Sequence, residues 1–156
     1  GHILWICPMP LTSAELAQAG KRLAQRIPPA ALAEFESIKD RIRKTGRDKG
    51  EDPFRCIAPW YFARREIPEG FDTGFRVLVA DRLSHLFSAY DFSETVRTPG
   101  GKSTVILGED DYIRVGDLTA LCSAAKRVCV IPGAAHYPFA ENPQAFEAAV
   151  LGTIDG

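Results

Sequence analysis

The sequence predicts an α/β fold built on a parallel β-sheet with helices on its faces. Two short apolar runs rich in β-branched residues, 104–107 and 128–131, are separated by a helical stretch of about ten residues. This is the spacing of a βαβ unit in a parallel sheet. A third run at 3–7 is continuously apolar and ends at Pro8, as a buried parallel strand does.

Composition and charge narrow the class of protein. The chain has 156 residues, of which 46% are hydrophobic and 25% charged, which favours one globular domain. Its net charge of −1 gives no indication of nucleic-acid or membrane binding. No apolar run is long enough to span a bilayer, and no signal peptide is visible. The four cysteines lack metal-binding spacing and are predicted to be buried free thiols of a cytoplasmic protein.

The strand at 3–7 is followed by helical patterns. Thr12 and Glu15 form a capping box that predicts a helix to about residue 27. Pro28 and Pro29 end this helix and begin the next, in which apolar residues recur at helical spacing up to Ile42. The charged stretch 44–52 is predicted to be an exposed, mobile loop.

Two more helical stretches follow before the second strand. Residues 53–66 are predicted to form a helix that Pro59 kinks or divides. Residues 75–90 form an amphipathic pattern whose inward side chains should be Val79, Leu83, Leu86 and Phe87. A connector at 91–102 contains Pro99, Gly100 and Gly101.

The end of the chain carries a further helical pattern. Residues 143–154 are predicted to form a helix that buries Phe146, Val150 and Leu151.

Polar residues follow the last two predicted strands at the point where each ends. Asp110 and Asp111 come after the first strand and Gly108, and His136 comes after the second strand and Gly133. In parallel sheets, catalytic groups collect in loops at the carboxyl ends of the strands. An acid and a histidine 25 positions apart can therefore meet there.

These two turns, V-I-L-G-E-D-D-Y-I and I-P-G-A-A-H-Y-P-F-A-E-N-P, resemble the acid and histidine loops of α/β-hydrolases, most closely the branch of proline iminopeptidases and related esterases. The resemblance maps the acid onto Asp111 and the base onto His136, each three residues after its glycine. Asp110 is the alternative acid, or else a solvated turn or N-cap residue. The specific motifs lie within 103–143.

The resemblance also implies a domain layout. The chain would be the C-terminal part of an α/β-hydrolase, with strands 6–8 and their helices in residues 1–10 and 91–156. Residues 11–90 would be a helical cap, or lid, inserted after strand 6. No G-x-S-x-G nucleophile motif is present, so the nucleophile would lie before Gly1.

A histidine held by a carboxylate has nothing to activate without a nucleophile. The expected partner is therefore the N-terminal half of the fold, as a separate chain in a heterodimer. The partner chain could arise by cleavage of a precursor or from a second gene. An excised fragment and a strand-swapped homodimer are the open alternatives to a heterodimer.

The expected substrate is a small or peptide-like molecule, and Tyr137 and the aromatic cluster Trp60, Tyr61 and Phe62 are candidate substrate-binding residues. Packing within the cap is the other interpretation of that cluster. The resemblance implies neither a metal nor an organic cofactor. Glu66 and Glu69 could hold a substrate ammonium, as cap carboxylates do in aminopeptidase-like relatives.

The predicted function is acyl transfer from an ester, amide or thioester to water or another nucleophile, with aminopeptidase-like substrates favoured weakly. His136 would act as general base and then general acid, oriented by Asp111. The alternative is a non-catalytic remnant that binds a partner or a small ligand. An intact small enzyme that uses its own Ser or Cys is disfavoured, because Cys122 and Cys129 fall in helix and strand interiors.

Overall fold

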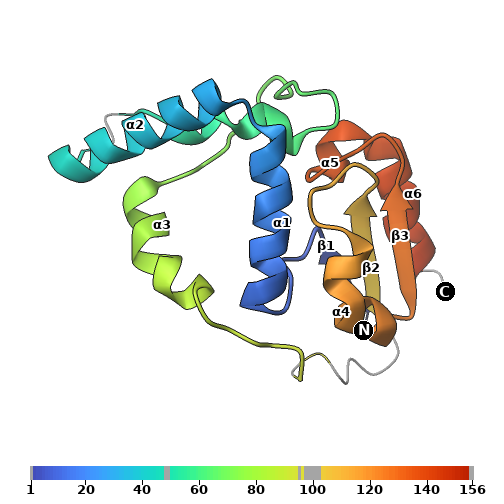
Figure 1. Ribbon diagram of the computed structural model, residues 1–156. Helices are drawn as coiled ribbons and strands as arrows, with labels where there is room; N and C mark the ends of the chain where they lie inside the picture. The colour runs from blue at the N-terminus through green and yellow to red at the C-terminus, as the bar shows by residue number, and fades with distance from the viewer. Residues whose placement is uncertain (1, 48–49, 95, 97–102, 155–156) are drawn as a thin grey trace.

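The computed structural model describes residues 2–47, 50–94, 96 and 103–154. Its sheet contains three parallel strands in the order β1 (Ile3–Ile6), β2 (Ser103–Gly108) and β3 (Arg127–Ile131), as Figure 1 shows. The predicted α/β class with a parallel sheet is therefore confirmed. The connector around Gly100 and part of the loop predicted at 44–52 lie outside the described residues.

Strand β2 is the centre of this sheet, and both its faces are covered. Val105 and Leu107 point to one side and pack with Leu121 of helix α4 (Thr119–Ala124). Ile106 points to the other side and packs with Ala149 of helix α6 (Pro143–Ile154). Because both faces are covered, every residue of β2 is buried, and its apolar run Val105–Leu107 is continuous rather than alternating.

The long segment between β1 and β2, residues 11–90, is helical and lies to one side of the sheet (Figure 1). We call it the helical segment. Its elements are α1 (Ser13–Arg26), α2 (Pro29–Thr45), the short 3₁₀ helices η1 (Pro53–Cys56) and η2 (Ala58–Tyr61), α3 (Val77–Leu83) and the 3₁₀ helix η3 (Ser84–Phe87).

The first two helices begin and end where local chemistry dictates. The Thr12 hydroxyl accepts from the backbone N–H of Glu15, whose carboxylate accepts from the N–H of Thr12, both at 3.2 Å. This reciprocal cap satisfies two amides that a helix start leaves free. Pro29 occupies the first turn of α2, and Gly46 ends the helix in a left-handed conformation with φ of 64°.

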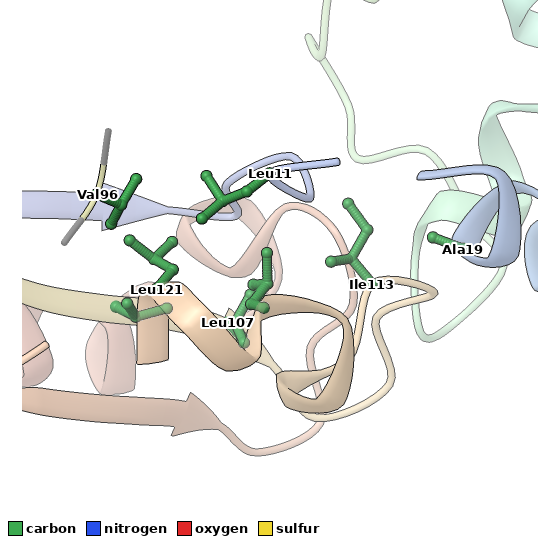
Figure 2. Close-up of a cluster of buried hydrophobic side chains, with 8 residues drawn as sticks. Leu11, Ala19, Val96, Leu107, Ile113 and Leu121 are labelled. Atoms are coloured by element: carbon green, nitrogen blue, oxygen red, sulfur yellow. The ribbon is translucent and has the colours of Figure 1, made fainter. Parts of the chain in front are cut away.

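One hydrophobic cluster joins the helical segment to the sheet. Leu11 and Ala19 come from that segment, while Leu107 comes from β2 and Leu121 from α4 (Figure 2). The full set of buried members is Leu11, Ala19, Val96, Val105, Leu107, Ile113, Leu118 and Leu121. Because α1 buries residues in the same core as the sheet, its position relative to the strands is fixed by packing.

The two ends of the helical segment are also tied to each other. Thr12 and Asp91 form an isolated antiparallel bridge. The N–H of Ser13 donates to the carbonyl of Tyr90 at 3.0 Å, and the N–H of Phe92 donates to that of Leu11 at 2.8 Å. We call this pairing the neck of the helical segment.

The later part of the helical segment differs from the prediction. Residues 53–66 were predicted to form a helix that Pro59 kinks or divides. The segment is divided just before Pro59, whose missing N–H cannot continue the first helix, but the two parts are short 3₁₀ helices that end at Tyr61. The helix predicted at 75–90 is confined to α3 and η3.

The side chains predicted to point inward there, Val79, Leu83, Leu86 and Phe87, are exposed instead. The periodicity is real, but no described element covers that face.

The C-terminal helix forms where it was predicted, with one error in its buried face. Phe146 and Val150 pack against the core, whereas Leu151 is exposed. A short helix that was not predicted, α5 (Pro138–Glu141), precedes it.

The four cysteines are free, but each is only partly buried rather than fully buried. No helix in the described ranges is long and apolar enough to cross a membrane.

Candidate active site

Strand β2 ends at Gly108, where it runs directly into the acid loop, residues 109–114. A Cβ atom on Gly108 would lie 2.0 Å from the carbonyl oxygen of Ala135 and 2.4 Å from that of Ala134. The backbones therefore approach more closely here than any side chain permits, so only glycine fits. This contact brings the acid loop against the histidine loop, residues 132–137.

Backbone hydrogen bonds join the two loops. The N–H of Glu109 donates to Ile131 at 3.0 Å, and the N–H of Asp110 donates to Ala134 at 2.9 Å. The Glu109 carboxylate accepts in return from the N–H of Gly133 at 3.1 Å. Gly133 has φ of 64°, a conformation that favours glycine and turns the chain back toward the acid loop.

The Asp111 carboxylate and the His136 ring meet at the carboxyl edge of the sheet. Nδ1 of His136 lies 3.1 Å from Oδ2 and 3.2 Å from Oδ1 of Asp111. The Asp111 side chain is fully buried and also accepts from the N–H of Ile113 at 3.1 Å. The His136 side chain remains 17% exposed.

A buried carboxylate on Nδ1 fixes the tautomer and the orientation of an imidazole. The residues that the structure describes form no hydrogen bond to Nε2 of His136. This nitrogen is therefore available to accept a proton. Asp110, the other candidate acid, has an exposed side chain and holds its place through its backbone.

Three tyrosine rings surround the imidazole. Tyr112 lies 4.9 Å from it between ring centroids, Tyr137 lies 5.2 Å away and Tyr61 lies 5.8 Å away. Burial is the main cause that raises the pKa of each of these phenols, and the Asp111 charge adds to it. The rings are therefore neutral at physiological pH.

Two of the four predicted substrate-binding residues, Tyr61 and Tyr137, thus contact His136. Phe62 is buried and packs its ring against Tyr137 at 5.0 Å. Trp60 packs instead against the cluster around Leu23 and Phe54 inside the helical segment.

Cys7 follows β1 and has an unusual backbone, with φ of 44°. Burial raises the pKa of its thiol to about 12, and the charges of Asp111 and Glu141 contribute. Because the thiolate is the nucleophilic form of cysteine, this thiol is poorly suited to attack a substrate. Within the described ranges, no group of three His, Cys, Asp or Glu side chains is placed to hold a metal ion.

The structure adds residues that the sequence did not single out. Arg26 of α1 donates to the carbonyls of Asp110 at 2.7 Å and Asp111 at 3.4 Å. Arg22, one turn earlier, donates to the carbonyl of Tyr112 at 3.1 Å and pairs with the Asp117 carboxylate. The signal for Arg22 and Arg26 was only their i, i+4 spacing on α1, which does not reveal a partner on a distant loop.

A groove of about 850 Å³ lies beside this site, between α1, α3 and the stretch around Phe75. Tyr61 forms part of its wall. The apolar lining residues are Met9, Leu16, Tyr61, Phe75, Val79, Ala80, Leu83 and Phe87. Val79 and Leu83, two of the exposed apolar side chains of α3, therefore form part of the wall of this groove.

The comparisons with known proteins bear on the fold. No family model matches the sequence, and no curated protein matches it. Among solved structures, the chain is similar to a proline iminopeptidase from Mycobacterium smegmatis, with a TM-score of 0.56 and 20% sequence identity. The match covers 97% of this chain and 56% of that one, so the chain spans about half the length of its structural neighbour. Such a likeness shows the fold alone: a mixed α/β chain with a parallel sheet, consistent with part of an α/β-hydrolase.

Proposed function

We propose that this chain is the acid- and histidine-bearing subunit of a two-chain hydrolase of the α/β-hydrolase type. The observation that carries the proposal is the buried Asp111 carboxylate held 3.1 Å from Nδ1 of His136. The nucleophile, a serine on a G-x-S-x-G turn, comes from a complementary chain that supplies the other half of the sheet.

In the proposed reaction, Nε2 of His136 accepts the proton of the attacking hydroxyl group and later donates it to the leaving group. Asp111 keeps Nδ1 protonated and stabilises the imidazolium that forms. The bond cleaved is an ester, amide or thioester. Amides of peptide-like substrates are the weakly favoured class, by analogy with the structural neighbour named above.

Residues 11–90 act as the cap in this proposal. Tyr61 supports that role, because it contacts His136 and also lines the apolar groove along α3. An apolar acyl or side-chain group of the substrate can lie in that groove while its carbonyl group reaches His136. Tyr137 also contacts the imidazole and lies beside Tyr61, with 6.5 Å between their ring centroids.

The free edge of β1 supports the proposed partner. In the described part of the chain, β1 pairs only with β2, and its other edge carries no strand. Ile3 and Ile6, which point to opposite faces, are 45% and 41% exposed. Exposed apolar faces beside an unpaired edge promote aggregation unless another chain covers them.

The neighbouring surface continues this apolar region. A cavity of about 450 Å³ beside β1 is lined by Trp5, Pro8, Met9, Pro10, Leu11, Leu86, Phe87, Tyr90, Phe92 and Leu121. Trp5 also has a buried Nε1 that finds no hydrogen-bond partner among the described residues. A strand added along β1 with its flanking helix would cover these side chains.

The decisive experiment is to isolate the chain with everything that copurifies with it under non-denaturing conditions and to record intact masses. A second polypeptide should be present, and a fluorophosphonate probe should label that polypeptide and not this one. Hydrolysis of p-nitrophenyl esters and aminoacyl-naphthylamides should then be lost in His136→Ala, with the assembly intact.

Two results would contradict the proposal. One is a stable monomer without any copurifying chain, which would favour the non-catalytic binding module. The other is labelling of a serine or cysteine in this chain itself.

A further inference from the structure

Glu141, the last residue of α5, makes three hydrogen bonds to backbone amides through its side chain. Its Oε1 accepts from the N–H of Ala63 at 2.6 Å. Its Oε2 accepts from the N–H of Ala135 at 2.7 Å and from that of Tyr137 at 3.4 Å. One carboxylate thus connects the helical segment with the two residues that flank His136.

The backbone of His136 is bound to the same part of the helical segment. Its N–H donates to the carbonyl of Tyr61 at 3.0 Å, two residues before Ala63. Three consecutive amides of the histidine loop, 135–137, therefore find their acceptors either in Glu141 or in the helical segment. None of the three donates to the sheet.

Two of these bonds are short, at 2.6 and 2.7 Å, as hydrogen bonds to a carboxylate acceptor are, and the bond from Tyr137 is longer. Both oxygens of Glu141 are occupied by amides. Although Glu141 also lines a pocket of about 290 Å³ with Glu66 and Glu69, its carboxylate is thereby committed to the backbone.

We propose that Glu141 is a positioning residue. It holds the backbone of His136 against residues 61–63 so that Nδ1 stays within hydrogen-bond distance of Asp111. A displacement of the helical segment would move Ala63 and Tyr61, and through them His136. The placement of the helical segment is therefore coupled to the geometry of the Asp111–His136 pair. The catalytic consequence rests on the proposed function, but the coupling itself does not.

The test compares Glu141→Gln and Glu141→Ala with Glu147→Gln, a matched control on the exposed part of α6. A glutamine side chain of the same size has one oxygen and one NH₂ group, so it cannot accept from both sides. In the Glu141 variants, amide hydrogen exchange at residues 63 and 135–137 should become faster by about tenfold or more. Exchange in β2 should not change.

A second readout follows the pair directly. The proton shared between Nδ1 of His136 and Asp111 should give a low-field NMR signal that disappears in Asp111→Asn. The signal should weaken or broaden in both Glu141 variants and persist in Glu147→Gln. If Glu141→Ala does not fold, Glu141→Gln alone decides the outcome.

The assembled enzyme provides the kinetic arm. Loss of positioning should lower kcat in Glu141→Gln by about tenfold or more while KM changes little. Unchanged exchange at residues 63 and 135–137, together with an unchanged low-field signal, would overturn the proposal for Glu141. Absence of any hydrolysis with native Glu141 would instead count against the proposed function. Amide exchange and the low-field NMR signal would still test the coupling, because neither depends on hydrolysis.

Discussion

Gly108→Ala is the substitution whose effect follows most directly from the close approach of two backbones at the end of β2. The new Cβ atom would lie 2.0 Å from the carbonyl oxygen of Ala135 and 2.4 Å from that of Ala134. A carbon atom approaches a carbonyl oxygen no closer than about 3.3 Å, so the strand end and the histidine loop must separate by about 1 Å. Both obstacles are backbone atoms, which cannot rotate away as a side chain can.

This separation has a cost in stability and another in activity. Overpacking of a rigid site costs about 3 kcal/mol, the upper end of the usual range, because the backbone itself has to move. A shift of 1 Å would lengthen the 3.1 Å contact between His136 and Asp111 beyond hydrogen-bond distance. In the proposed two-chain hydrolase, a misplacement of this size should lower kcat by about 10²-fold.

Urea unfolding followed by circular dichroism measures the first effect, and ester hydrolysis by the assembled enzyme measures the second. Gly116→Ala is the matched control, because a Cβ atom there meets nothing within 4 Å. Its free energy of unfolding should stay within about 0.5 kcal/mol of that of the native chain. Equal unfolding midpoints for Gly108→Ala and Gly116→Ala would refute the reasoning.

Three further predictions concern the acid loop and its surroundings. Asp111→Asn should lower kcat of the assembled enzyme by about 10⁴-fold with the fold intact, because an amide no longer enforces the tautomer of His136; a loss below tenfold would contradict the role of the carboxylate. Arg26→Ala removes two bonds to the acid loop and should lower the free energy of unfolding by about 1 kcal/mol, measured in urea; no change would mean that water replaces the guanidinium. Stability should also fall at high pH: the fold raises the pKa of Cys7 from 9.0 to about 12, so its contribution is complete below pH 9 and is lost as pH rises toward 12. Urea midpoints at pH 8 and pH 10.5 should show this fall, and Cys7→Ala should reduce it; an identical fall in that variant would assign it to the tyrosines.

Local signals predicted the parts of the fold that depend on local chemistry. The capping box at Thr12 and Glu15 and the proline at position 29 determine where two helices start, and each of the three strands contains a continuous apolar run. The meeting of Asp111 and His136 followed from a topological rule, since loops at the carboxyl ends of neighbouring parallel strands share one edge. Their roles in catalysis stay predictions.

Other features depend on partners that are distant in sequence or that lie outside the chain. The bond from Glu141 to Ala63 joins residues 78 positions apart, and no periodicity signals it. Phe87 recurs at helical spacing, yet it is exposed, because spacing shows which residues share a face and not what covers that face. Tyr112 stands next to Asp111, but adjacency alone did not indicate that its ring would contact His136.

The neck formed by Thr12, Asp91 and their neighbours has a consequence for how such a molecule can diversify. The neck holds the two ends of the helical segment together, so the helical segment forms a closed loop on the rest of the chain. The entropic free-energy cost of closing a flexible loop rises by only about 0.6 kcal/mol for each doubling of its length. Evolution or protein engineering could therefore replace the helical segment with one of another size, provided that the replacement keeps the hydrogen-bond donors and acceptors that contact the acid loop and the histidine loop.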